Sequence, residues 1–227
     1  GVDAEGQPVR GDGDGTAIFF LELLTNVAVA NLHRVETVWQ PVHAHFMALL
    51  QAANAPSLAV ERVVVNELRL CIRLMECHDA VVNADLMEGL RALSALPAHV
   101  QHALAERISV GMLTFLRANA TLIRSREDWK TVASQLQEFA GNSPSASRPA
   151  LEALTFCVNE EKAISALNFD FVLQALLSFL EATLDAAVAR QHACVAYRTP
   201  SPTPNDIRKW QVQTSRTVMG LLYALFV

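Results

Sequence analysis

Apolar residues recur at helical spacing along almost the whole chain, and no stretch shows the two-residue alternation of a half-buried strand. Between residues 16 and 32 the apolar side chains cover most of the helix circumference, so that only Glu22, Asn26 and His33 form a polar stripe. A helix with so narrow a polar stripe is expected to be buried on several sides. The pattern predicts nine helices, over residues 16–32, 36–53, 57–75, 85–96, 97–118, 125–139, 149–162, 168–190 and 205–225.

Capping and turn residues mark the ends of these segments. Ser57 stands four residues before Glu61, near a helix start, and the run Ser125-Arg-Glu-Asp128 resembles a capping box with Ser125 at the N-cap. Pro41 falls early in its helix, where it is tolerated in the first turn and otherwise kinks the helix. Residues 1–15 predict a flexible lead-in, residues 141–149 a linker and the proline-rich residues 199–204 a stiff extended connection.

Many helices with short connections and no strand favour an all-α fold, an antiparallel α-solenoid of the HEAT or armadillo type with about nine helices. The sequence shows no strict repeat period, so this prediction concerns the architecture alone. Trp39, Leu70, Phe115 and Phe179 are predicted to be buried in the core. The start at Gly1 and the apolar end of the chain lead us to expect that the helices continue in a longer protein.

Composition and charge narrow the possible functions. A chain with 52% hydrophobic and 18% charged residues suits stacked helices and does not suit a disordered protein. The net charge of −5 argues against nucleic-acid binding, which needs a dense basic surface. It also argues against simple attraction to an anionic membrane, but it leaves local insertion of an apolar helix open. No run of 18 apolar residues is present.

The chemistry-bearing residues form no recognisable catalytic or metal site. His43 and His45 stand at i and i+2, about 200° apart on a helix, so one metal ion cannot readily bind both. Asp12 and Asp14 begin like a calcium loop but lack its remaining ligands, and the adjacent carboxylates at 127–128 and 160–161 have no catalytic partner. The four cysteines lie in apolar helical runs without CxxC spacing, so we expect buried reduced thiols: Cys71, Cys77, Cys157 and Cys194. No cofactor or metal is predicted.

Several blocks of the chain resemble a known family. They are 20–24 (FLELL), 31–35 (NLHRV), 38–40 (VWQ), 60–64 (VERVV), 68–74 (LRLCIRL), 116–120 (LRANA) and 125–129 (SREDW). In order and spacing these blocks are similar to the first homology region downstream of the catalytic domain in the large Golgi-type Arf guanine-nucleotide exchange factors, the brefeldin-A-related Gea/GNOM class. Residues 165–171 (SALNFDF) and 180–184 (LEATL) resemble the opening of the next downstream region.

The resemblance implies a domain division and a role. Residues 16–141 would be the first downstream homology region, 142–149 the linker and 150–227 the start of the second. The parent protein would load GTP onto Arf at Golgi membranes from the cytoplasm, with a catalytic glutamate in a domain that matches nothing in this chain. The chain itself would then be no enzyme but a regulatory, membrane-associating module. Its implied partners are membrane lipid, other domains of the same protein and Rab-type small GTPases, with Arf bound by the parent catalytic domain.

The first helix carries one set of candidate contact residues. Its four large apolar side chains could contribute roughly 6–10 kcal/mol if they inserted into lipid, before ordering costs. The same side chains are worth as much inside the helical stack, and packing is the favoured expectation, with release of the helix only at membranes. The four residues are Phe19, Phe20, Leu23 and Leu24.

Three arginines form the second set. Arg62, Arg69 and Arg73 are spaced by seven and four residues and lie on one face of their helix. Either they pair with Glu61 and Glu67, or they contact a lipid phosphate or an acidic partner. The alternative to a membrane module is a generic α-solenoid scaffold that binds only protein partners, and a helical enzyme without a recognisable motif is the weakest interpretation.

Overall fold

The computed structural model describes residues 13–160 and 163–226, and all regular structure within them is helical. These residues form ten α-helices and three single 3₁₀ turns, so the all-α prediction is confirmed with one α-helix more than predicted. The α-helices are α1 (Gly13–Ala30), α2 (Val35–Ala52), α3 (Leu58–Leu74), α4 (Ala80–Ser94), α5 (Ala98–Asn119), α6 (Arg126–Glu138), α7 (Pro144–Asn159), α8 (Phe169–Ala182), α9 (Ala186–Ala196) and α10 (Pro204–Phe226).

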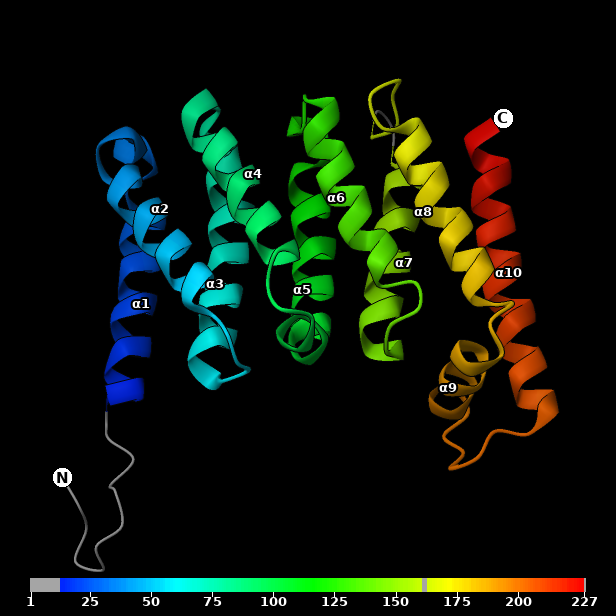
Figure 1. Cartoon of the computed structure of the whole chain (residues 1–227). Coiled ribbons are helices and arrows are strands. Elements are labelled where there is room, and N and C mark those ends of the chain that lie inside the picture. Colours follow the sequence, from blue (N-terminus) through cyan, green and yellow to red (C-terminus); the bar gives the residue numbers. More distant parts are fainter. Residues whose placement is uncertain (1–12, 161–162, 227) are drawn as a thin grey trace, which may run out of the picture.

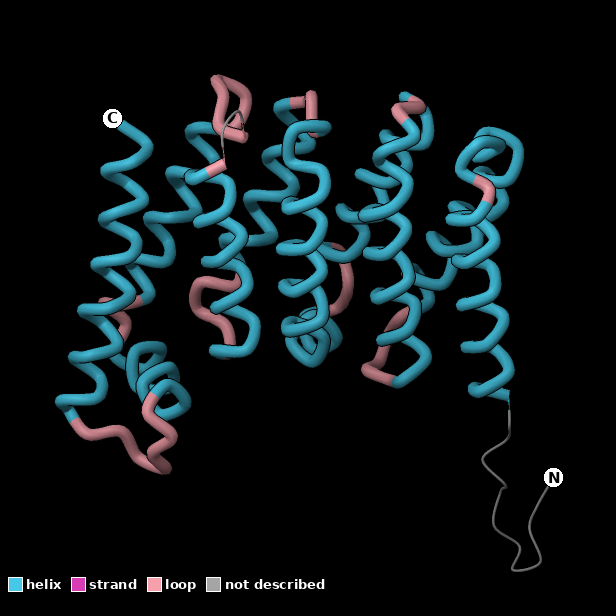
Figure 2. The backbone as a smooth tube through the Cα atoms, turned by 180° about the vertical axis from the view of Figure 1, so that it is seen from behind, coloured by secondary structure: helices cyan, strands magenta, loops and turns pink. Residues whose placement is uncertain are grey.

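The helices stand side by side in two layers, and the chain crosses from one layer to the other at almost every turn (Figure 1). One layer holds α1, α3, α5, α7 and α10, and this layer is nearer to the viewer in Figure 2. The other layer holds α2, α4, α6 and α8. The short α9 packs against α10 and α7. An inner helix such as α5 therefore has a neighbour on each flank and the second layer against its back, which explains why apolar residues surround most of its circumference.

One continuous core runs between the layers, and the four predicted core residues all lie in it. Trp39, Leu70, Phe115 and Phe179 are each at most 2% exposed. The four cysteines are free thiols, of which Cys71 and Cys157 are buried and the other two half-buried.

Helix starts follow the side chains that cap them. The Ser57 hydroxyl accepts a hydrogen bond from the Val60 amide at 3.1 Å, and the Ser125 hydroxyl accepts one from the Asp128 amide at 3.4 Å, as the sequence predicts. Asp79 accepts hydrogen bonds from two amides at 2.9 Å, so α4 begins at Ala80 and not at residue 85.

Two predicted segments differ from the structure. The helix predicted over 168–190 is broken after α8, because the Asp185 carboxylate accepts hydrogen bonds from the amides of Ala187 and Val188 and starts α9. In the predicted linker, Pro144 opens α7, since a proline lacks only an amide that the first helical turn leaves unpaired. At the N-terminus α1 already begins at Gly13, while residues 1–12 of the predicted lead-in lie outside the described residues.

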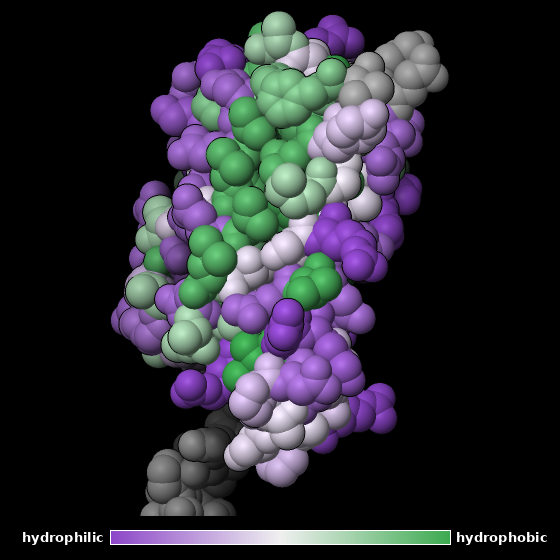
Figure 3. Space-filling view, turned by 90° about the vertical axis from the view of Figure 1, so that its right-hand side faces the viewer, coloured by the Kyte–Doolittle hydropathy of each residue, from purple (hydrophilic) through white to green (hydrophobic). Residues whose placement is uncertain are grey.

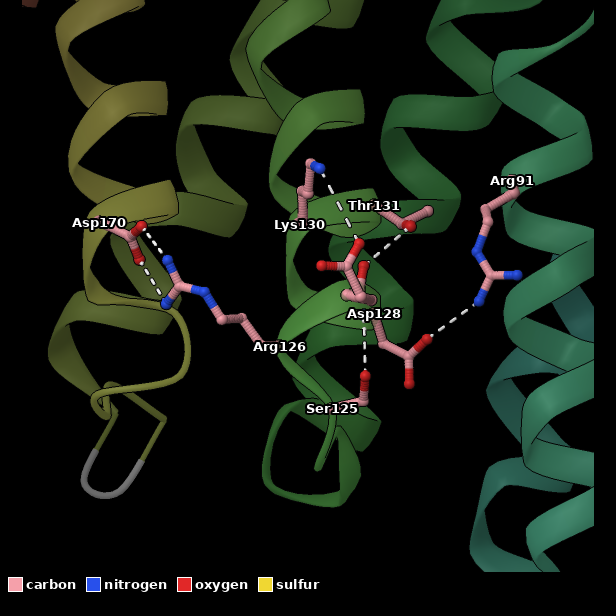
Figure 4. A network of polar contacts seen from close by, with 8 residues as sticks. Arg91, Ser125, Arg126, Asp128, Lys130, Thr131 and Asp170 are labelled. Atoms are coloured by element: carbon pink, nitrogen blue, oxygen red, sulfur yellow. Dashed lines mark hydrogen bonds and ion pairs between the residues drawn. The ribbon is translucent and has the colours of Figure 1, made fainter.

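Ion pairs join neighbouring helices of the same layer (Figure 4). Arg91 of α4 contacts Asp128 of α6 at 3.1 Å, and Arg126 of α6 makes two hydrogen bonds with the Asp170 carboxylate of α8, at 3.2 and 2.5 Å. In the other layer Arg107 of α5 pairs with Glu61 of α3 at 2.9 Å. Exposed pairs of this kind contribute about 0–1 kcal/mol each, so they favour one alignment of the helices and add little stability.

The two end helices carry apolar side chains on faces that no described helix covers. On α10 these are Val212, Met219 and Tyr223, next to the largely exposed Phe226, whose ring meets that of Phe169 of α8 edge to face. Figure 3 shows an apolar patch over the upper part of this side of the molecule. Among the described residues no single helix is both long and apolar enough to cross a membrane, and two bent helix pairs, 15–30 with 32–52 and 169–182 with 186–196, meet that test only when combined.

A buried carboxyl group lies between α3 and α4. Glu67 is 1% exposed and lies directly over Gly89, where a Cβ atom would come within 1.8 Å of the Glu67 Oε1 atom. The Cys71 thiol is its polar contact among the described residues, with the sulfur 3.9 Å from Oε1. Burial raises the pKa of Glu67 from 4.5 to about 7.

We expect this shift to make stability depend on pH. Between pH 4.5 and 7 the unfolded carboxyl is ionised while the folded one holds its proton, so folding becomes less favourable as pH rises, by about 3 kcal/mol in total. Glu67→Gln, which cannot ionise, should therefore unfold with a larger free energy than the wild type at pH 8 and with a similar one at pH 4. Urea denaturation at both pH values measures this, and Glu106→Gln is the control for an exposed carboxylate. Equal pH dependence in the wild type and Glu67→Gln would contradict the prediction.

Phe115 tests the core itself. Phe115→Ala removes a ring with no exposed surface and should lower the free energy of unfolding by about 3–5 kcal/mol. Val110→Ala on the same helix is the matched control, because Val110 is 45% exposed and its truncation should be nearly neutral. A small thermal shift for Phe115→Ala would show that the ring is not a core residue.

Candidate functional site: the exposed face of α1 and the arginines of α3

One face of α1 packs against α3. Leu21, Thr25 and Ala28 are buried there, and the Thr25 hydroxyl donates a hydrogen bond to the Leu21 carbonyl at 3.0 Å. Leu24 lies at the edge of this packed face and is half-buried. These residues recur every three or four positions, so they fix which side of α1 faces the stack.

The opposite face of α1 is apolar and exposed. Phe19 is 61% exposed, Phe20 59%, Leu23 46% and Val27 44%, and these four residues span an arc of about 100° on the helix. The Phe19 and Phe20 rings meet edge to face with their centroids 5.5 Å apart. The expectation that packing within the stack takes up these side chains is therefore wrong for Phe19, Phe20 and Leu23. Among the described residues, α1 has a neighbouring helix of its own layer on one flank alone.

Two of the three predicted arginines reach from α3 to α1. An Arg62 Nη1 atom lies 3.7 Å from the Glu22 Oε1 atom, and an Arg69 Nη2 atom donates a hydrogen bond to the Asn26 side-chain oxygen at 2.9 Å. On α1, Glu22 and Asn26 border the exposed apolar face. Arg73 is exposed and makes no ion pair or hydrogen bond with the described residues.

The carboxylates expected to pair with these arginines lie elsewhere. Glu61 pairs with Arg107 of α5, and Glu67 is buried over Gly89. Sequence spacing on one helix suggested partners within α3, but the helices pack so that the arginines extend toward the neighbouring helix of the same layer. The partner of Arg69 on α1 is a neutral amide and not a carboxylate.

The structure thus brings predicted contact residues from two helices into one surface, which we call the α1 strip. It consists of Phe19, Phe20 and Leu23 together with Val27, is bordered by Arg62 and Arg69, and continues to Arg73 on the same face of α3. Leu24, the remaining predicted contact residue, lies at the edge of the packed face and is half-buried. Sequence reasoning found no basic residue on the polar stripe of the first helix, but α3 supplies guanidinium groups beside it. Exposed apolar side chains bordered by cations are the usual composition of surfaces that lie on anionic membranes.

A second group of polar side chains lies on the other layer. His43 of α2 lies close to Asp85 and Glu88 of α4, and these are the only three histidine, cysteine or acidic residues in the described part of the chain that are placed to share one ion. His45 is exposed and takes no part, as the i, i+2 spacing predicts. Asp12 of the calcium-loop-like run and Glu161 of the adjacent carboxylates at 160–161 lie outside the described residues.

Comparison with known proteins identifies similar sequences. The chain is 31% identical over 171 residues to the ARF guanine-nucleotide exchange factor GNL1 of Arabidopsis thaliana and 29% identical over 182 residues to GNOM of the same plant. These matches cover 75% and 78% of this chain and 12% of each relative. It is 30% identical over 131 residues, 57% of its length and 6% of the relative, to the Golgi-specific brefeldin A-resistance guanine nucleotide exchange factor 1 homolog of Caenorhabditis elegans. No family model and no solved structure matches the chain.

The two faces of α1 can be distinguished by a matched pair of substitutions. Leu21→Ala should lower the free energy of unfolding by about 2–5 kcal/mol, because Leu21 is 6% exposed and packs on α3. Leu23→Ala, two residues away on the exposed face, should change it by about 1 kcal/mol or less. Chemical denaturation of both variants measures the difference, and equal losses would show that the face carrying Leu23 is also packed.

Proposed function

Since this chain is a homologue of one segment of the large Golgi-type Arf guanine-nucleotide exchange factors, we propose that it is a non-catalytic regulatory and membrane-association module of such a protein. The α1 strip is the observation that carries the membrane part of this proposal. The relatives are named as exchange factors for ARF, and the chain spans only 12% of the two plant relatives. Loading of GTP onto Arf would then be the work of a catalytic domain elsewhere in the parent protein.

The free energy that the α1 strip could gain by inserting into lipid suits reversible binding to a cytoplasmic membrane surface such as that of the Golgi. Burying one large apolar side chain completely contributes about 1.5–3 kcal/mol. The four apolar side chains of the strip are about half exposed, so their further burial in lipid contributes on the order of 3–6 kcal/mol before ordering costs. Arg69 and Arg73, which form no ion pair with the described residues, add about 1 kcal/mol each near an anionic surface, whereas the charge of Arg62 is offset by Glu22.

Membrane contact through the α1 strip leaves α1 docked. Its packed face carries Leu21 and Ala28, and its exposed face carries Phe20 and Leu23, so the two roles use different side chains. We therefore revise the expectation that the helix leaves the stack when it meets lipid.

The arrangement of the helices supports an antiparallel α-solenoid of the HEAT or armadillo type as the architecture of this module. Helix pairs repeat along one direction, and same-layer contacts join residues 35 to 46 positions apart, close to the repeat length of such proteins. We keep the division into a first homology region over 16–141, a linker over 142–149 and a second region from 150 to 227. The division follows the sequence resemblance and not a break in the packing. The Ser109 hydroxyl of α5 donates a hydrogen bond to the Ala146 carbonyl of α7, so the helices pack continuously across the proposed linker.

The exposed face of α10 favours a second role in protein contact. Met219, Tyr223 and Phe226 lie at the other end of the stack from α1, on a face of α10 that also carries the exposed basic residues Arg208, Lys209 and Arg216. Such a face suits other domains of the same protein or a small GTPase of the Rab kind. If the module bound proteins alone, as a generic scaffold, neither end would have measurable affinity for lipid.

Liposome co-sedimentation tests the proposal. The double variant Phe20→Ser, Leu23→Ser should lose most of the binding to vesicles that contain anionic lipid, because it removes exposed apolar surface and leaves the packed face intact. The matched control Met219→Ser, Tyr223→Ser removes similar exposed surface from α10 and should bind as the wild type does. Arg73→Gln should weaken binding to anionic vesicles about fivefold and leave binding to neutral vesicles unchanged.

Unchanged binding by the α1 variant, at an unchanged melting temperature, would reject the α1 strip as the membrane contact. Absence of lipid binding in the wild type would favour the scaffold interpretation. Nucleotide exchange on Arf measured with this chain alone should equal the rate without it, and any acceleration would contradict the non-catalytic assignment.

A further inference from the structure

Three potential metal ligands meet where α2 packs against α4. His43 projects from α2, and Asp85 and Glu88 project from one face of α4, where residues three apart are neighbours. One ligand atom from each residue lies within 4.8 Å of the other two, and the His43 Nε2 atom is 3.5 Å from a Glu88 carboxylate oxygen.

These separations fit a shared ion. Zinc binds imidazole nitrogen and carboxylate oxygen at about 2.0–2.2 Å, which places two ligands of a tetrahedral ion about 3.3–3.6 Å apart. The contact between His43 and Glu88 already has this spacing, and Asp85 has to approach by no more than about 1 Å.

Neighbouring side chains hold the ligands in place. The Asp85 Oδ2 atom accepts hydrogen bonds from the Trp39 indole nitrogen at 2.9 Å and from the Gln40 amide nitrogen at 3.1 Å. This leaves its other carboxylate oxygen available to an ion. The His43 ring stacks on the buried Trp39 ring with the centroids 5.6 Å apart, and the His43 side chain is only 12% exposed. Hydrogen bonds that orient ligands in this way are a regular feature of protein metal sites.

We propose that His43, Asp85 and Glu88 bind one first-row divalent cation, with zinc the best match. An imidazole nitrogen disfavours calcium and magnesium, which prefer oxygen ligands alone, whereas zinc accepts one imidazole, two carboxylates and a water molecule. Two carboxylates balance the charge of the ion. The ion would link α2 to its neighbour α4 in the same layer. Its role is therefore to stabilise the packing of these two helices and not to catalyse a reaction.

This site was missed from sequence because its ligands come from positions about 42 to 45 residues apart. The sequence paired His43 with His45, whereas the structure places His43 beside Asp85 and Glu88. His45 lies exposed on the same helix and outside the cluster, which makes it the matched control.

Thermal unfolding and calorimetric titration with zinc chloride, on protein first treated with EDTA, test the proposal. The wild type and His45→Ala should bind one equivalent of zinc saturably, with a rise in melting temperature that EDTA reverses. His43→Ala and Glu88→Gln should lose this binding at least tenfold. Gln40→Leu, which removes a hydrogen bond to Asp85 and no ligand, should weaken it about 10–100-fold.

Several outcomes would overturn the site. These are no saturable binding by the wild type, binding by His43→Ala and Glu88→Gln equal to that of the wild type, or loss of binding in His45→Ala. Glu88→Gln keeps the test decisive if His43→Ala does not fold, because Glu88 is 54% exposed and its amide is nearly isosteric. Cobalt in place of zinc provides an independent readout, since a visible absorption band that requires His43 reports ligation directly.

Discussion

Each helix of the two layers depends on a neighbour in its own layer. Two antiparallel helices alone cannot cover the wide apolar faces of the inner helices, so burial is complete only when further helices pack on both flanks. This requirement accounts for the 52% hydrophobic composition and for the full burial of Phe115 in the middle of the stack. It also accounts for the exposed apolar side chains at the two ends of the stack, because α1 and α10 each have one flank that no other described helix covers. The candidate membrane contact is therefore a direct consequence of the packing that forms the core.

Buried polar side chains determine how these flanks align. The Ser109 hydroxyl donates a hydrogen bond to the Ala146 carbonyl of α7, the Gln135 side chain donates to the Leu90 carbonyl of α4, and the Asn119 side chain donates to the Ile72 carbonyl of α3. Each of the three groups would cost about 1–3 kcal/mol if it were buried without a partner, so sliding one helix along the next is strongly disfavoured. Apolar packing alone tolerates many alignments, and these three hydrogen bonds together with the surface arginine pairs select one of them.

Local signals predicted the parts of the fold that local chemistry decides. The hydroxyl groups of Ser57 and Ser125 cap helices where the sequence placed them, and apolar spacing identified Trp39 and Phe179 as core residues. The break at Asp185 was missed because an apolar run continues on both sides of it, so that a single capping carboxylate outweighs the periodicity. Contacts between helices could not be predicted in the same way, since no pattern within α3 shows that Arg69 faces Asn26.

The dependence of the α1 strip on two helices has a consequence for how it would act. The apolar side chains belong to α1, while the cations that border them belong to α3 and are positioned by Glu22 and Asn26. If α1 left the stack, Phe20 and Leu23 would lose the adjacent arginines, and Leu21 and Ala28 would become exposed. A membrane that binds both the apolar side chains and the arginines therefore favours the state in which α1 is docked. The equilibrium between docked and undocked α1 shifts by the ratio of the membrane affinities of these two states. Lipid binding and folding of this end of the molecule then stabilise each other, and a partner that displaced α1 would weaken membrane association without touching the lipid.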